Sequence, residues 1–296
     1  MTPGQGIDGP PGVLTTVGGR RLHVVDEGAG PPLLLMAALG SSWWDLDPLA
    51  SRLAAGGWRV IRYDRPGYGL SDPPGRGEHP TLLGEVDRMA AVLDTAGVQT
   101  PAAVVGHSLA SLYVEAFGRV HPDRTAALVV IDGSFSMTPV HLVPRAWSVW
   151  AARWLSDHAQ AICVWLGVDR WPRERVWRLV VPPPPEGFTA DHHRWVGQLF
   201  GRAPFLAALV AENAMFGAMD RTLRRLRHTN PLPAVPSRVI VAAPRTPGWR
   251  QFWEWKQRRY AALLGADVDV IPRARHFVVS QRPDEVAVAI DALAVG

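Results

Sequence analysis

Short apolar runs alternate with helix-like segments over residues 22–131 and again over residues 238–293, and this alternation limits the possible folds. Two of the runs, residues 33–38 and 126–131, are continuously apolar over a strand length. Such a run is typical of a strand that is buried on both faces. Strands separated by helices form parallel sheets covered by helices on both sides. The sequence therefore predicts an α/β fold with a mostly parallel sheet.

The alternation stops between residues 136 and 233, where no strand pattern is found. Helix-like segments rich in tryptophan fill this stretch, together with four consecutive prolines at 182–185, which we expect to form an extended connector. An all-helical insertion in a sheet protein is typical of a lid. We therefore expect a core of residues 1–135 and 234–296, with residues 1–12 disordered, and a helical lid of residues 136–233.

The composition argues against several classes of protein. The net charge is +4, but basic residues are scattered among acidic ones and no zinc-finger or RNA-binding signature is present, so we expect no nucleic-acid partner. No window contains the ~18 apolar residues that a membrane span needs. Residues 1–12 lack the apolar segment of a secretory signal. The single cysteine, Cys163, cannot form an internal disulfide, which favours a cytoplasmic location.

Ser108 lies in a sharp turn between an apolar run, residues 102–105, and a helix-like segment, residues 109–120. A strand, a turn and a helix are the context in which a serine can act as a nucleophile at the sheet edge. The turn strains the backbone, so the residues two before and two after the serine must be small. Gly106 and Ala110 meet this requirement. We therefore predict that Ser108 is a nucleophile, with a plain strand-to-helix turn as the alternative.

A serine nucleophile needs a base within hydrogen-bond reach, and His276 is the best candidate. It follows the apolar run 268–271 through a short loop, and a parallel sheet places that loop at the same edge as Ser108. The other histidines lie in the opening hairpin, in proline-flanked loops or in the expected lid. His107 flanks the serine, and we interpret it as a packing residue. A histidine in a surface loop is the alternative interpretation of His276.

Three segments together resemble the α/β-hydrolase superfamily: residues 63–72 (Tyr-Asp-Arg-Pro-Gly-Tyr-Gly-Leu-Ser-Asp), 106–110 (Gly-His-Ser-Leu-Ala) and 276–277 (His-Phe). The similarity extends from about residue 13 to residue 293. It implies an eight-stranded, mostly parallel sheet with helices on both faces and a lid inserted between strands six and seven. It also implies a Ser-His-acid triad or a close variant of it.

The acid of this triad departs from the usual family pattern, which places an Asp after strand seven. Residues 238–247, which occupy that place, contain no carboxylate. Some members carry the acid after strand six instead, where this chain has Asp132. We therefore expect Asp132 to orient His276 and to stabilise its cation. Asp267 and Asp269 are poorer candidates because they lie near or within a strand, and a Ser-His pair without an acid stays open.

The loop after the third strand also departs from the family pattern, because Ala37 and Ala38 replace the usual His-Gly. The resemblance implies that the backbone N–H groups of Leu39 and Leu109 form the oxyanion hole. A backbone donor does not depend on the side chain, but Ala38 adopts a positive φ less easily than glycine does. Within the family motif we interpret Asp64 as a structural residue that buttresses this loop.

The predicted reaction is hydrolysis of an ester or a related acyl bond, in which Ser108 attacks the carbonyl and His276 transfers the proton. A serine nucleophile argues against the haloalkane dehalogenase and epoxide hydrolase members, which use Asp. The tryptophans of the expected lid favour a small hydrophobic substrate. Its 12 arginines against 7 acidic residues suggest a weaker hypothesis, an anionic substrate or an acyl chain on an acidic carrier protein. No phosphate-binding glycine loop is present, so we expect no cofactor and no metal.

Two other classes of function stay open from the sequence. A lyase or a C–C bond hydrolase could use the same Ser-His pair, and analysis of the products would separate these from an esterase. A non-catalytic ligand-binding member of the superfamily is the second alternative, because the loop at Ala37 and Ala38 is altered. Ligand binding without turnover, unaffected by Ser108→Ala, would support it.

Overall fold

The computed structural model describes residues 9–135, 142–165, 167 and 172–293. Eight strands in this part of the chain form one sheet, in the order β1-β2-β4-β3-β5-β6-β7-β8. The β1–β2 and β2–β4 pairs are antiparallel and all other pairs are parallel. The strands are β1 (Val13–Val17), β2 (Arg20–Glu27), β3 (Pro32–Met36), β4 (Arg59–Tyr63), β5 (Ala102–His107), β6 (Thr125–Ile131), β7 (Ser237–Ala243) and β8 (Asp267–Pro272). The predicted eight-stranded, mostly parallel sheet is confirmed.

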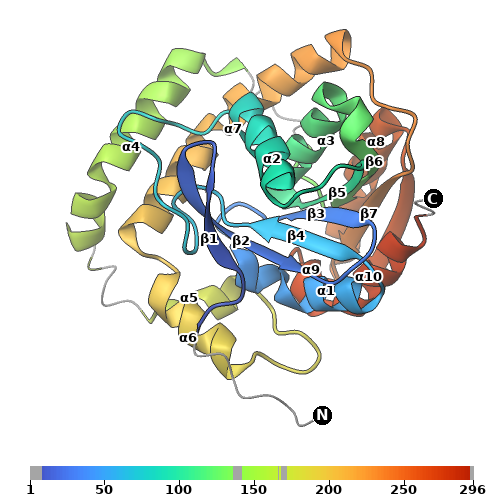
Figure 1. Ribbon diagram of the computed structural model, residues 1–296, viewed down its shortest axis with the longest axis horizontal. Coiled ribbons are helices and arrows are strands. Elements are labelled where there is room, and N and C mark those ends of the chain that lie inside the picture. The colour runs from blue at the N-terminus through green and yellow to red at the C-terminus, as the bar shows by residue number, and fades with distance from the viewer. Residues whose placement is uncertain (1–8, 136–141, 166, 168–171, 294–296) are drawn as a thin grey trace.

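Helices cover both faces of this sheet (Figure 1). One face carries α1 (Trp43–Ala55), α9 (Val278–Gln281) and α10 (Pro283–Asp291), and the other carries α2 (Leu82–Thr95), α3 (Ser111–Val120) and α8 (Pro247–Leu264). Alternate residues of the central strand β3 point to opposite faces, so Leu33 and Leu35 join one apolar cluster while Leu34 and Met36 join the other. The continuous apolar run is therefore a strand buried on both faces, as predicted.

Two helices begin earlier than their sequence pattern suggests. The spacing of apolar residues predicts a helix over residues 48–55, whereas α1 begins at Trp43, where Asp45 accepts a hydrogen bond from the Ser42 N–H and caps the first turn. Pro48, which suggested a helix start, lies one turn inside. The spacing of apolar residues predicts the other helix only from about residue 252, whereas α8 begins at Pro247. No side-chain cap is present at Thr246, and Pro247 occupies the first helical position, where its missing N–H costs no hydrogen bond.

The described residues between β6 and β7 form four helices: α4 (Arg145–Trp165), α5 (Arg173–Val180), α6 (Ala190–Leu199) and α7 (Ala203–Thr229). No strand interrupts them in residues 142–165, 167 and 172–236. We call this segment the helical insertion. Its expected first residues, 136–141, lie outside the described residues, as do residues 1–8 of the N-terminal segment that we expect to be disordered. The four prolines of residues 182–185 connect α5 to α6.

A buried carboxyl group ties this insertion to the core. Asp45 of α1 accepts a hydrogen bond of 2.7 Å at Oδ1 from the Trp177 indole of α5, and one of 2.7 Å at Oδ2 from the Ser41 hydroxyl. Burial raises the pKa of Asp45 to about 7, although these donors oppose the shift. Trp44 of α1 and Trp177 lie in one apolar cluster and are each 1% exposed. The insertion therefore packs on α1 through apolar contacts around a polar centre.

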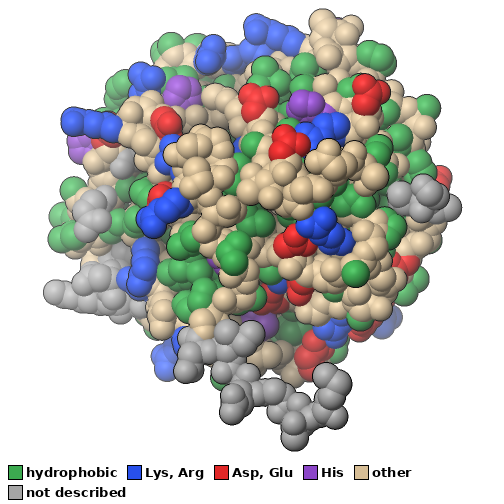
Figure 2. All heavy atoms as spheres, viewed as in Figure 1, with side chains coloured by type: hydrophobic (Ala, Val, Ile, Leu, Met, Phe, Trp, Pro, Cys, Tyr) green, Lys and Arg blue, Asp and Glu red, His purple; other side chains and the backbone are tan. Residues whose placement is uncertain are grey.

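The surface shows no large segregation of charge on the face seen in Figure 2, where Lys and Arg side chains are interspersed with Asp and Glu. Among the helices that the structure describes, none is both long and apolar enough to cross a membrane.

The Asp45 carboxyl should make stability fall as the pH rises. Its pKa is about 7 in the folded chain against an ordinary value of 3.8, so between about pH 4 and pH 7 the folded chain holds a proton that the unfolded chain releases. This single group should therefore lower the free energy of unfolding across that window by up to roughly 4 kcal/mol. Urea unfolding at several pH values should show a flatter profile for Asp45→Asn than for the wild type.

Asp26→Asn is the matched control, because Asp26 forms an ion pair with Arg59 at the surface. This variant should keep the wild-type slope. Identical slopes for the wild type and Asp45→Asn would contradict the assignment.

Candidate active site

The carboxyl ends of four neighbouring parallel strands, β3, β5, β6 and β7, meet at one edge of the sheet. The strand register aligns Met36 of β3 with Gly106 of β5, and His107 with Ile131 at the end of β6. Ile131 in turn aligns with Ile240 of β7. The segments that follow these strands therefore lie side by side, at the edge where parallel sheets place their ligand sites.

Ser108 stands in a strained turn directly after β5. Its φ is 56°, and the chain continues through a single 3-10 turn, Ser108–Ala110, into α3. A Cβ atom at Gly106 would lie 2.5 Å from Val114 Cγ2 and 2.9 Å from the Ala110 carbonyl oxygen. Glycine is therefore required at this position for steric reasons. The serine side chain stays at the sheet edge, where the residue is 8% exposed.

The structure brings the three predicted side chains into one chain of hydrogen bonds. Ser108 Oγ lies 2.8 Å from His276 Nε2, and His276 Nδ1 lies 2.6 Å from Asp132 Oδ2. With the proton on Nδ1 donated to the carboxylate, Nε2 is free to accept the serine proton. The His276 side chain is 43% exposed, whereas that of Asp132 is 2% exposed. The acid is thus internal, the serine is largely buried, and the histidine is partly exposed.

The other oxygen of Asp132 is also fully engaged. Oδ1 accepts hydrogen bonds from the Ala242 N–H of β7 at 3.0 Å and from the Trp253 indole of α8 at 2.6 Å. Of the alternative acids, Asp269 accepts a hydrogen bond of 2.5 Å from Arg238, and both it and Asp267 lie within β8. The structure therefore places Asp132, and neither of the others, beside His276.

Backbone strain is concentrated at this edge of the sheet. Among the described residues, the non-glycine residues with a positive φ are Ser108, Asp132 and Arg273, with values of 56°, 47° and 56°. All three line the same pocket. Strain of this kind persists only where surrounding contacts enforce it, and it is typical of functional sites.

His107 fixes the loop that carries His276. Its ring Nε2 lies 2.8 Å from the His276 carbonyl oxygen, to which it donates a hydrogen bond. Burial, together with the nearby His276, lowers the pKa of His107 to about 3, so the ring is neutral at pH 7. The residue that we interpreted as packing thus also joins the serine turn to the histidine loop.

Arg65 holds the loop after β3, where the sequence placed one oxyanion donor. Its guanidinium donates to the Ala37 carbonyl at 2.6 Å and to the Ala38 carbonyl at 2.8 Å. The peptide bond between Ala38 and Leu39 is trans, so the Leu39 N–H points away from the Ala38 carbonyl in the same peptide plane. The two hydrogen bonds therefore set the direction of the Leu39 N–H, although neither alanine side chain takes part.

Asp64 supports the start of α1 just beyond this loop. Its Oδ1 accepts the Trp43 N–H at 2.9 Å, and its Oδ2 lies 2.9 Å from His23 Nδ1 and 3.2 Å from the Leu70 N–H. The motif residue that we interpreted as a buttress of this loop therefore anchors the adjacent helix and its own turn.

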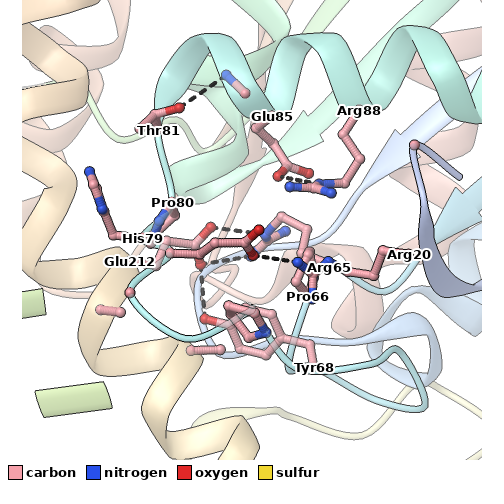
Figure 3. Close-up of a pocket in the computed structure, with 17 residues that line it drawn as sticks. Arg20, Arg65, Pro66, Tyr68, His79, Pro80, Thr81, Glu85, Arg88 and Glu212 are labelled. Atoms are coloured by element: carbon pink, nitrogen blue, oxygen red, sulfur yellow. Dashed lines mark hydrogen bonds and ion pairs between the residues drawn. The ribbon is translucent and has the colours of Figure 1, made fainter. Parts of the chain in front are cut away.

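Glu212 of α7 completes the buried network around Arg65, and Figure 3 shows it pointing toward both Arg65 and Tyr68. Arg65 Nε and Nη2 lie 2.9 and 3.0 Å from the two Glu212 oxygens, and the hydroxyls of Tyr68 and Tyr113 donate to them at 2.8 and 2.7 Å. Burial opposes the charge of Arg65, but the carboxylate holds its pKa above the ordinary value. No sequence motif had singled out Glu212.

The Ser-His pair opens into a pocket of about 700 Å³. Two further residues of this pocket, Ser134 and Trp253, were not predicted from the sequence. Ser134 Oγ lies 3.4 Å from Ser108 Oγ, and Trp253 donates to Asp132. Ser134 could have been suspected from its place two residues after Asp132, whereas nothing local marks Trp253. Among the described residues, no group of three His, Cys, Asp or Glu side chains is arranged to hold a metal ion.

Comparisons with known proteins identify the family of this fold. A model of the "Alpha/beta hydrolase family" matches residues 22–289. The chain is 33% identical over 125 residues to bifunctional epoxide hydrolase 2 of Mus musculus, covering 42% of this chain and 22% of that protein. It is 34% identical over 144 residues to the haloalkane dehalogenase of Mycobacterium marinum, covering 45% and 44%. The chain thus spans less than half the length of either relative.

A solved structure extends the likeness over nearly the whole chain. The thermophilic esterase from Thermogutta terrifontis, determined with malate bound, has a TM-score of 0.64 at 20% identity. The match covers 94% of this chain and 95% of the esterase. At this level of identity the likeness shows the fold alone.

Gly106→Ala should destabilise the protein by about 1–3 kcal/mol, because the added methyl group meets the backbone of Ala110 and the side chain of Val114. Gly248→Ala in α8 is the control, since a methyl group there has no atom within 4 Å. This second change should be neutral or stabilising. Urea midpoints of the two variants measure the difference. Equal urea midpoints for the two variants would mean that the serine turn tolerates a side chain at residue 106.

Proposed function

Because the chain belongs to the alpha/beta hydrolase family, we propose that it is a serine hydrolase that cleaves an ester or related acyl bond of a small substrate. The observation that carries the proposal is the hydrogen-bonded series from Ser108 through His276 to Asp132. A serine hydroxyl activated in this way is a nucleophile for acyl carbons. The relatives named epoxide hydrolase and haloalkane dehalogenase share the family, and the serine distinguishes this chain from the Asp-dependent members.

In the proposed reaction, Ser108 Oγ attacks the carbonyl carbon while its proton moves to His276 Nε2. The tetrahedral intermediate collapses as His276 returns that proton to the leaving alcohol, and the acyl group stays on Ser108. Water then attacks the acyl carbon and gives a proton to His276, which passes it to Ser108 as the acid leaves. Asp132 holds the histidine in the required tautomer throughout.

The backbone N–H groups of Leu39 and Leu109 are the proposed oxyanion donors. Leu109 lies one residue after the nucleophile, in the turn that leads into α3. Leu39 lies in the loop that Arg65 holds by the Ala37 and Ala38 carbonyls. These hydrogen bonds offer a physical reason why two alanines could replace the usual His-Gly, since the side chain of Arg65 supplies the fixed geometry. Arg65 is in this view a positioning residue.

We propose that residues 136–233 act as a lid, with residues 1–135 and 234–296 as the core. The insertion lies between β6 and β7, and Glu212 of α7 shares a network with the loop that follows β3. A helix so connected can cover a site at the carboxyl edge of the sheet and respond to its contents. A small substrate is consistent with a pocket of this size.

A fluorophosphonate probe tests the proposed function directly. The wild type should form a stoichiometric adduct on Ser108, located by mass spectrometry, and Ser108→Ala should form none. Asp132→Asn should lower kcat on aryl esters by roughly 10⁴-fold, because the histidine then adopts the wrong tautomer. Ser134→Ala should keep the adduct and so exclude the neighbouring hydroxyl as its site. A folded wild type without any adduct would refute the proposed acyl chemistry.

The role of Arg65 is tested through its partner on α7. Glu212→Gln removes the charge that fixes Arg65, so the Leu39 N–H should lose its alignment and kcat should fall roughly 10- to 100-fold. KM should change little, since an oxyanion donor acts mainly in the transition state. Steady-state kinetics on an aryl ester measure both constants.

Glu115→Gln is the matched control for this experiment. Glu115 of α3 is also buried and also pairs with an arginine of α7, Arg227, at 2.7 Å. Its loss should reduce stability without a comparable fall in kcat. If the two variants lose kcat equally, the effect belongs to packing of α7 and not to the oxyanion loop.

A further inference from the structure

Three arginines surround the pocket that contains Ser108 and His276. Arg245 follows β7, whereas Arg273 and Arg275 lie in the loop between β8 and His276. In the described part of the chain, none of the three forms an ion pair with Asp or Glu. Guanidinium groups elsewhere in the fold, such as Arg65, do have carboxylate partners. The pocket therefore concentrates positive charge that the protein itself leaves uncompensated.

The one carboxylate that lines this pocket is occupied. Asp132 uses Oδ1 for the Trp253 indole and the Ala242 N–H, and Oδ2 for His276. It is also 2% exposed, so it faces the interior more than the pocket. The arginines therefore have no internal anion to bind within the site.

The loop that carries Arg273 and Arg275 is held by hydrogen bonds to other parts of the fold. Arg275 Nη2 donates to the Leu179 carbonyl of α5 at 2.8 Å, and the Arg275 N–H donates to the Gln281 side chain at 2.7 Å. Arg273 has a φ of 56°, and the next residue, Ala274, donates its N–H to the Ala243 carbonyl at 3.0 Å. A loop held in this way presents its charges with little loss of entropy on binding.

Apolar surface lies beside these charges. Trp249 of α8 stacks on Trp253, with ring centroids 5.8 Å apart and an angle of 26° between the rings. Trp249 is 53% exposed, and both indoles line the pocket. The pocket thus combines an apolar wall with cationic groups, around a nucleophile.

We propose that this pocket selects esters that carry a carboxylate, with the anionic group bound by Arg245, Arg273 and Arg275 and the ester carbonyl at Ser108. The proposal rests on the proposed function and names its substrate class. Arginine binds carboxylates through paired charge-assisted hydrogen bonds, and a cleft lined by one sign of charge attracts the opposite sign. The methylene or ring carbons between the two groups lie against the indoles.

The proposed anion site lies in the core and not in residues 136–233, where the sequence suggested it. From the sequence, the weaker hypothesis of an anionic substrate rests on the arginines of residues 136–233. Arg245, Arg273 and Arg275 belong instead to the core segments that follow β7 and β8, next to the nucleophile. The carboxylate can come from the acyl part or from the alcohol part of the ester, and matched substrates separate these two sources.

The experiment compares esters that differ only in charge. For the acyl side the pair is the monoaryl ester of adipic acid and the corresponding aryl hexanoate, and for the alcohol side it is 4-acetoxybenzoate and its methyl ester. In the wild type, kcat/KM for at least one anionic ester should exceed that of its neutral partner by about tenfold or more at low salt. Added salt should reduce this preference, mainly through KM.

Single changes of Arg245, Arg273 and Arg275 to Gln should each reduce the ratio of kcat/KM for the anionic ester to kcat/KM for its neutral partner. Arg258→Gln is the control, because it removes the same charge from an exposed position of α8 outside the pocket. Neutral esters turned over at least as well as anionic ones would overturn the proposal. So would pocket variants that behave like Arg258→Gln.

Calorimetric titration of Ser108→Ala with the same esters separates this proposal from the proposed function. If the wild type forms no fluorophosphonate adduct but the Ser108→Ala protein binds the anionic ester, and loses that binding in Arg273→Gln, the anion site stands and the acyl chemistry fails. If the wild type forms the adduct but the Ser108→Ala protein binds the anionic and the neutral ester equally well, the acyl chemistry stands and the anion site is refuted.

Discussion

The carboxylate of Asp132 joins four parts of the molecule that are far apart in the sequence. It accepts hydrogen bonds from the Ala242 N–H of β7 and the Trp253 indole of α8, and it bonds to His276 beyond β8. A carboxylate that is 2% exposed needs such partners, because an unpaired buried charge is strongly destabilising. The contacts that satisfy this charge therefore also set the place of His276 beside Ser108.

A second buried charge connects the sheet edge to the helical insertion. Arg65 lies between the carbonyl groups of the loop after β3 and the carboxylate of Glu212 on α7. Buried ion pairs add little net stability, but they specify geometry strongly because few arrangements satisfy every donor and acceptor. A shift of α7 would disturb the loop that carries Leu39. The proposed lid and the proposed oxyanion site are thus mechanically linked.

Arginines with a carboxylate partner and arginines without one have different roles at this site. Arg65 is buried and fully bonded to the protein, and it acts on the backbone. Arg245 and Arg273 are exposed residues that line the pocket of the nucleophile. A charge neutralised internally supports the structure, whereas an uncompensated one can bind a ligand. This difference is the basis of the proposed preference for anionic esters.

The sequence by itself determined the sheet, the helices on its faces and the position of Ser108 after β5, because apolar periodicity and turn residues are local signals. It also favoured Asp132 as the acid, since no carboxylate follows β7 closely, but it left a Ser-His pair without an acid open. It missed the true start of α1 and the partners Glu212 and Trp253. Those depend on contacts across the fold: Glu212 is 147 residues from Arg65, and Trp253 is 121 residues from Asp132. Only the tertiary structure decided which distant side chains meet. A buried polar group needs a hydrogen-bond partner, and the fold, not the distance along the chain, determines which residue lies close enough to be that partner.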